Sequence, residues 1–260
     1  MTPRGKLHSL VTGIGRVVAI GASNLTRGFQ TVVATARTAW GPDVQVVAAL
    51  GHGRSYGTDS SFMVRRLPAI LQSGIWQQLE STPAVPTKAL VTDIGNDIVY
   101  GFPPGQILAW VDDALTRLAL VSDDVVLTDL PMDSIRRLST ARFHAFRSVF
   151  FPSCRLSFEA LVATAEQVNA GLAELAGAHR VRFQHLRPSW YGVDPIHIRP
   201  SLWRTAWQEV LGISCPIPRS RIEALRLYAM RPERQWLFGV EQWTTQAGAR
   251  LRGGGRVWLY

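Results

Sequence analysis

The chain has 260 residues, of which 47% are hydrophobic and 18% charged, and its formal net charge is +9. This length and composition fit a compact protein with a substantial core and exclude disorder on a large scale. No apolar run approaches the roughly 18 residues that span a bilayer. The apolar tract at 10–15 is interrupted by Thr and Gly and lacks a cleavage site, so we expect a cytoplasmic protein without a secretion signal.

A strand followed by a helix is the first element that the sequence predicts. The apolar run 17–20 stops at Gly-Ala-Ser, and apolar side chains then recur every three or four positions over 26–40. This pattern indicates a buried strand that leads into an amphipathic helix. Ser23, on the turn, is expected at the carboxyl edge of a sheet beside a helix N-terminus. It is therefore a candidate nucleophile or, alternatively, an N-cap residue of the helix.

The same alternation continues along most of the chain. Further strands are expected at 44–50, 89–94, 124–130 and 181–186, and helices at 62–79, 106–121, 157–176 and 201–211. Strands that alternate with helices imply parallel pairing with right-handed crossovers. We therefore expect a three-layer α/β/α fold around a parallel five-stranded sheet, with ligands binding at the carboxyl ends of the strands.

Two segments stand outside this alternation. Residues 131–156 mix aromatic residues with arginines, which is typical of a surface helix that packs its apolar side on the core or of a flap over an active site. Residues 212–260 hold eight arginines and three glutamates. We expect a catalytic domain at 1–211 and a basic appendage at 212–260. The appendage is expected to contain a helix at 219–230 and strands at 239–244, 246–251 and 256–260.

Asp194 and His197 follow the last of the alternating strands. A carboxylate three residues before a histidine on a turn can hold Nδ1 of the imidazole, which leaves Nε2 free to take a proton from a serine. Short turns also hold such pairs for structural reasons. What favours a functional role is the position of the pair, on the same edge of the predicted sheet as Ser23.

Acyl transfer also needs donors aimed at the oxyanion that develops during the reaction. Three donors follow strand ends: the backbone N–H of Ser23, the backbone N–H of Gly53 and the side-chain amide of Asn96. Glycine at 53 allows a substrate to approach the backbone closely. Asn96 is alternatively a turn residue that bonds its own backbone.

Four short blocks resemble those of the SGNH/GDSL hydrolase superfamily, in order and at compatible spacing over about 15–211. They are Gly-Ala-Ser-Asn at Ser23, Leu-Gly-His-Gly-Arg-Ser at Gly53, Ile-Gly-Asn-Asp at Asn96 and Asp-Pro-Ile-His at His197. The resemblance implies a flavodoxin-like fold, a Ser23 nucleophile and a His197 base oriented by Asp194. It also implies an oxyanion hole made by Ser23, Gly53 and Asn96.

The blocks depart from the family pattern at several positions. Ala22 and Asn24 stand where the family usually has Asp and Leu, and Ile198 stands where the family usually has Pro after its histidine. None of these changes removes a catalytic group. His52 and Arg54 flank Gly53 and are candidates for contacting a polar or anionic substrate at the pocket rim, or for structural hydrogen bonds.

The leading hypothesis is therefore a serine hydrolase that cleaves a small acyl ester, acetyl or longer, through an acyl-enzyme intermediate. Transfer of the acyl group to another acceptor would use the same residues. We expect no cofactor and no metal, since Cys154 and Cys215 lack metal-ligand spacing. The alternative is an inactive α/β scaffold that binds nucleic acid or another polyanion through its arginine-rich tail.

Overall fold

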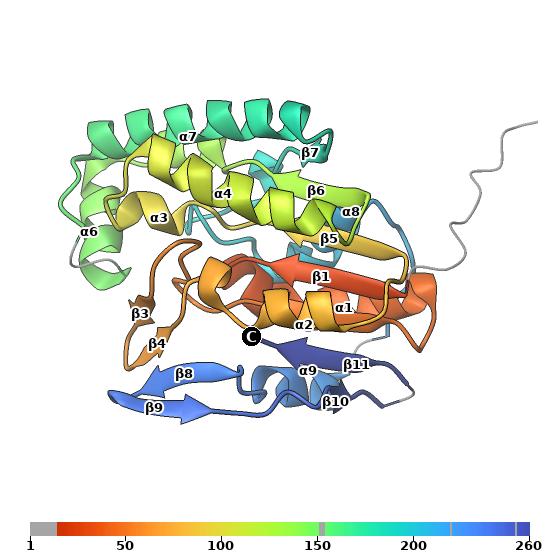
Figure 1. Ribbon diagram of the computed structural model, residues 1–260. Coiled ribbons are helices and arrows are strands. Elements are labelled where there is room, and N and C mark those ends of the chain that lie inside the picture. The colour runs from red at the N-terminus through yellow and green to blue at the C-terminus, as the bar shows by residue number, and fades with distance from the viewer. Residues whose placement is uncertain (1–14, 151–153, 219, 253) are drawn as a thin grey trace, which may run out of the picture.

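The computed structural model describes residues 15–150, 154–218, 220–252 and 254–260. A central, mostly parallel sheet is covered by helices on both faces (Figure 1). Within the described residues it has seven strands in the order β10-β11-β2-β1-β5-β6-β7, and β10 is antiparallel to its neighbour. The strands are β1 (Arg16–Ile20), β2 (Gln45–Ala49), β5 (Thr87–Val91), β6 (Asp124–Thr128), β7 (Arg182–Gln184), β10 (Ala249–Arg250) and β11 (Arg256–Leu259).

The helices form the two outer layers and the connections around the sheet. Their bounds are α1 (Ser23–Trp40), α2 (Ile75–Ser81), α3 (Asn96–Val99), α4 (Pro104–Ala119), α5 (Met132–Arg136), α6 (Thr140–Phe150), α7 (Phe158–Ala178), α8 (Trp203–Leu211) and α9 (Arg221–Tyr228). One core lies between the sheet and α2, α4 and α7, and a second lies between the sheet and α1, α8 and α9. This arrangement confirms the predicted α/β fold class.

Local sequence explains why the sheet is buried on both faces. Every residue of β1 is buried, and its side chains alternate between the two cores: Val18 and Ile20 belong to one, Val17 and Ala19 to the other. Such continuous apolar strands are typical of parallel sheets covered by helices on both sides. At α7, the Ser157 side chain accepts a hydrogen bond from the N–H of Ala160 and caps the helix.

The C-terminal segment differs from the predicted separate appendage. β11 pairs in parallel with β2, so it is a strand of the central sheet beside the five that were expected. β8 (Arg234–Leu237) pairs with β4 (Arg65–Leu67) in a second, four-stranded sheet that also contains β3 (Ser60–Phe62) and β9 (Val240–Trp243). Figure 1 shows this smaller sheet beside β11 and α9. The segment is thus joined to the rest of the chain by two sheets.

The predicted helix over 62–79 is wrong. Residues 60–67 form the hairpin β3–β4, and helical structure begins only with a short 3-10 turn at Ile70–Gln72 and with α2. Met63 has a left-handed φ of 54°, and Pro68 cannot donate the backbone hydrogen bond that a helix requires. The apolar spacing in this segment therefore reflects a hairpin followed by a short helix.

Two further expectations concern residues outside the described ranges. The expected absence of a secretion signal rests on residues 1–15, of which 1–14 are not described, and residues 151–153 of the predicted flap are not described either. Among the described residues, no helix combines the length and the apolar character that a membrane span needs.

Candidate active site

Ser23 is the first residue of α1 and follows the carboxyl end of β1. Its hydroxyl does not cap the helix. The carboxylate of Asp93, from the loop after β5, takes that role by accepting from the backbone N–H of Ala22 at 3.0 Å and of Leu25 at 2.9 Å. A negative charge is favourable at a helix N-terminus. Because Asp93 satisfies these donors, the hydroxyl of Ser23 is available for another partner.

That partner is His197. Its Nε2 lies 2.9 Å from Oγ of Ser23, and its Nδ1 lies 2.6 Å from Oδ2 of Asp194. The other carboxylate oxygen of Asp194 accepts from the backbone N–H groups of Ile196 and His197, at 3.2 and 3.1 Å. Burial alone would raise the pKa of Asp194, but these hydrogen bonds and the charge of the imidazole outweigh it and lower the pKa. The carboxylate therefore stays charged and can stabilise an imidazolium.

Asn24 fixes the histidine loop against the serine turn. Its side-chain amide donates to Asp93 at 2.9 Å and to the carbonyl of Ile196 at 2.8 Å, and its oxygen accepts from the N–H of Ile198 at 2.8 Å. Both flanks of His197 are thus tied to the residue that follows Ser23 in the chain. The sequence marked Asn24 only as a departure from the family pattern, because its partners are far from it in the chain.

The three candidate oxyanion donors come from three different loops. As the first residue of α1, Ser23 has a backbone N–H without an intrahelical acceptor. Asn96 begins α3, and its side-chain nitrogen donates to the carbonyl of Arg54 at 3.2 Å, which leaves its second hydrogen for a substrate. Gly53 has a left-handed φ of 66°, and its carbonyl accepts from the hydroxyl of Tyr100. These two hydrogen bonds connect the loop of Gly53 to the start of α3 and to Tyr100, the residue that follows α3.

Asp97 holds the loop that carries Gly53 through two hydrogen bonds. It is fully buried, and its carboxylate accepts from the hydroxyl of Ser55 and from the N–H of Tyr56. Burial raises the pKa of Asp97 to about 6, although both hydrogen bonds favour the charged form. In the Gly-Asn-Asp block, therefore, Asn96 is placed at the site and Asp97 holds the loop that carries Gly53.

The two residues that flank Gly53 lie in different environments. Arg54 is fully buried, and its guanidinium donates to the backbone carbonyls of Leu50, Pro68 and Tyr260. Of the two roles considered for Arg54, these contacts fit structural hydrogen bonds and not a place at the pocket rim. His52 is half-buried, and burial, with the nearby charges of Arg27, His197 and Arg65, lowers its pKa to about 4. It is thus neutral at neutral pH.

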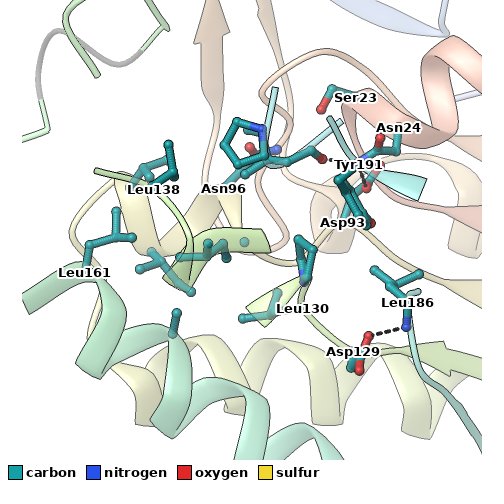
Figure 2. Close-up of a pocket in the computed structure, with 18 of the residues that line it drawn as sticks. Ser23, Asn24, Asp93, Asn96, Asp129, Leu130, Leu138, Leu161, Leu186 and Tyr191 are labelled. Carbon is teal, nitrogen blue, oxygen red and sulfur yellow. Dashed lines mark hydrogen bonds between the residues drawn. The ribbon is translucent and has the colours of Figure 1, made fainter. Parts of the chain in front are cut away.

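A cavity of about 100 Å³ opens beside Ser23 and Asn96 and extends beneath α5 and α6. In Figure 2, Ser23 and Asn24 lie at one end of it and Leu138 and Leu161 at the other. Most of its lining is apolar. The apolar side chains are Ile98, Val99, Leu130, Pro131, Ile135, Leu138, Phe143, Leu161, Ala165, Leu186, Pro195 and Ile196.

No known family model matches the sequence, and no curated protein matches it. Several solved structures are similar. The carbohydrate acetylesterase Est24 from Sinorhizobium meliloti matches with a TM-score of 0.51 and 12% identity, over 76% of this chain and 97% of its own. The native aryl esterase of M. smegmatis matches with a TM-score of 0.51 and 14% identity, over 76% of this chain and 97% of its own. A member of the lipolytic G-D-S-L family from Veillonella parvula matches with a TM-score of 0.48 and 13% identity, over 76% of this chain and 97% of its own.

At 12–14% identity, these similarities establish only a shared fold. The chain shares the α/β fold of the acetylesterase and the aryl esterase, with a mostly parallel sheet flanked by helices. The fold that the four sequence blocks implied is thereby confirmed.

Proposed function

We propose that this chain, which shares the fold of two esterases, is a serine hydrolase that cleaves carboxylic esters. The observation that carries this proposal is the hydrogen-bonded chain from Ser23 through His197 to Asp194. Nucleophile, base and orienting carboxylate are within hydrogen-bond reach of one another, which is the geometric signature of an activated serine.

In the first half of the reaction, Oγ of Ser23 attacks the carbonyl carbon of the ester while Nε2 of His197 accepts the hydroxyl proton. Asp194 stabilises the imidazolium that forms. The carbonyl oxygen becomes negative and is held by the N–H of Ser23, the N–H of Gly53 and the amide of Asn96. The intermediate then expels the alcohol, which takes the proton from His197, and leaves an acyl group on Ser23.

Water completes the cycle. His197 removes a proton from the water as the oxygen attacks the acyl carbon, and returns that proton to Oγ of Ser23 when the carboxylic acid leaves. Transfer to an acceptor other than water would follow the same steps with the acceptor in place of water. Acetyl esters are one substrate class, as in the acetylesterase with the same fold, and longer acyl esters or thioesters are another.

The alternative function, polyanion binding by the C-terminal segment, has less support. Arg234 is paired with Glu241 at 2.7 Å, so part of the positive charge of this segment is neutralised. An inert scaffold also gives no reason for the contacts between Ser23, His197 and Asp194. The esterase is therefore the function that we propose.

Replacing Ser23 tests this proposal. Ser23→Ala removes the nucleophile, and hydrolysis of p-nitrophenyl butyrate should fall by about 10⁵-fold or more. Ser189→Ala is the matched control, because Ser189 is an exposed serine outside the site and its loss should leave the rate unchanged. Retained hydrolysis in folded Ser23→Ala protein would refute the serine mechanism.

A further inference from the structure

The cavity beside Ser23 differs chemically from the surroundings of His197. Apolar side chains line its inner part: Phe143 from α6, Leu161 from α7 and Leu138 from the connection between α5 and α6. His197 does not line it. The groups around His197 are polar: Arg27 lies 3.9 Å from the carboxylate of Asp194, and its charge also acts on His52. An ester bound at Ser23 therefore has one apolar side and one polar side.

The mechanism decides which half of the ester occupies which side. The leaving oxygen must reach Nε2 of His197, since this nitrogen supplies the proton that the alcohol takes away. The carbonyl oxygen must reach the amide of Asn96, which lines the cavity together with Ser23. If the alcohol lies toward His197 and the oxyanion toward Asn96, the remaining substituent of the carbonyl carbon is directed into the cavity. That substituent is the acyl chain.

We propose that this cavity is the acyl-chain site of the enzyme and that its substrates are esters of fatty acids longer than acetate, with a polar alcohol. The inference rests on the proposed esterase function and adds the substrate class to it. An acetyl group ends at its methyl carbon and leaves the apolar inner end of the cavity unfilled. A longer chain removes apolar surface from water along Leu138, Phe143 and Leu161.

The effect of chain length has a predictable size. Each methylene that the cavity buries contributes about 0.8 kcal/mol, which corresponds to about a fourfold increase in kcat/KM. Part of this gain is lost where the chain fits imperfectly. From acetate to hexanoate, we therefore expect kcat/KM to rise by about tenfold or more.

The experiment measures kcat/KM for p-nitrophenyl acetate, butyrate and hexanoate below their aggregation concentrations. Ala165→Phe places a ring in the inner part of the cavity, because Ala165 is a buried lining residue of α7. It should lower the hexanoate-to-acetate ratio by about tenfold. Ala163→Phe, on the exposed side of the same helix, is the matched control and should keep the wild-type ratio. Leu161→Trp is a second filling variant if Ala165→Phe fails to fold.

A second ester series separates the two halves of the substrate. Ethyl, butyl and hexyl acetates vary the alcohol with the acyl group fixed, and Ala165→Phe should not change the preference among them. A flat acyl series in an active enzyme, or a change in the alcohol series instead, would overturn the acyl assignment and leave the esterase function standing. Absence of all ester hydrolysis by folded wild-type protein would instead refute the esterase function itself.

Discussion

At the scale of single residues, Asn96 tests the oxyanion hole. One amide hydrogen is bonded to the carbonyl of Arg54, and the other is available to a substrate oxygen. This second bond strengthens as negative charge develops on the oxygen, so it should stabilise the transition state more than the bound ester. We expect Asn96→Ala to lower kcat by about 10² to 10³, or roughly 3 to 4 kcal/mol, with little change in KM.

Measuring kcat and the melting temperature on the same preparation separates this role from a structural one. A turn residue would lower the melting temperature and leave the turnover of the folded fraction nearly intact. That result would remove Asn96 from the oxyanion hole.

His52 gives a pH prediction for stability. Its pKa is lowered from 6.5 to about 4 in the folded protein, chiefly by burial. Between these two values the unfolded chain binds more protons than the folded one, so this contribution to stability rises with pH from about 4 to 6.5 and is constant above. The free energy of unfolding of the wild type, minus that of His52→Phe, should follow this rise in denaturant titrations at several pH values.

The titration of Asp97 changes stability with pH in the opposite direction to that of His52. The effect of His52 must therefore be measured against a variant that keeps Asp97. The pKa of Asp97 is raised to about 6 from 3.8, so its contribution to stability falls as pH rises between these values. The wild type and His52→Phe share this contribution, which cancels in their difference. If that difference does not vary with pH, the titration of His52 is not perturbed by folding.

The sequence located the candidate catalytic residues better than the residues that hold them. Ser23 and the Asp194–His197 pair could be found because chemistry restricts which residue types serve at the end of a strand. Asn24 and Arg54 could not be interpreted in the same way. Asn24 bonds residues about 170 positions away, and Arg54 bonds Tyr260 about 200 positions away, so their environments depend on the complete fold.

At the scale of elements, the contact between α1 and α8 brings the two halves of the site together. α1 begins at Ser23, and α8 follows the loop that carries His197. They cross at Gly28, where an added Cβ would lie 1.8 Å from Nε1 of the buried Trp207. A glycine is required here because the indole occupies the place of a side chain.

Gly28→Ala should therefore force the two helices apart. We expect a loss of about 1 to 3 kcal/mol or more in the free energy of unfolding, together with weaker catalysis as His197 moves away from Ser23. Thermal unfolding and ester hydrolysis measure the two effects. The matched control is Gly177→Ala in α7, where an added Cβ meets nothing within 4 Å and should stabilise the helix by up to about 1 kcal/mol. Equal stability of the two variants would contradict this packing.

Helices with a local apolar pattern can be predicted from the sequence, whereas strands that depend on pairing with a distant segment cannot. The spacing of apolar residues indicated α1, α4 and α7 because each helix presents a continuous apolar side to one core. The hairpin β3–β4 is stabilised by pairing with β8, about 170 residues further along the chain. Local spacing carries no information on that pairing, which is why a helix was predicted there instead.

At the scale of the whole molecule, the C-terminal segment belongs to the structure that positions the site. In β11, Val257 and Leu259 are buried in the core beside α1, and the carbonyl of Tyr260 accepts from Arg54 next to Gly53. A chain ending at Leu211 would expose the edge of β2 and leave the Arg54 guanidinium without this partner. The segment therefore contacts both the core beside α1 and the loop that carries Gly53.

We predict that the chain ending at Leu211 does not fold cooperatively. Circular dichroism during heating should show no sharp transition, whereas the full chain should melt in one step. A shortened chain that melts cooperatively and hydrolyses esters would show that residues 212–260 are an independent appendage, as the sequence had indicated.

The most direct measurement of the central claim is the reaction of the protein with a fluorophosphonate, which phosphonylates activated serines whatever the natural substrate is. We predict a single covalent adduct in the intact mass of the wild type, mapped to Ser23 by peptide analysis. The adduct should be absent in Ser23→Ala and retained in Ser189→Ala. An unlabelled wild type, or labelling that persists in folded Ser23→Ala protein, would contradict the assignment of Ser23 as the nucleophile.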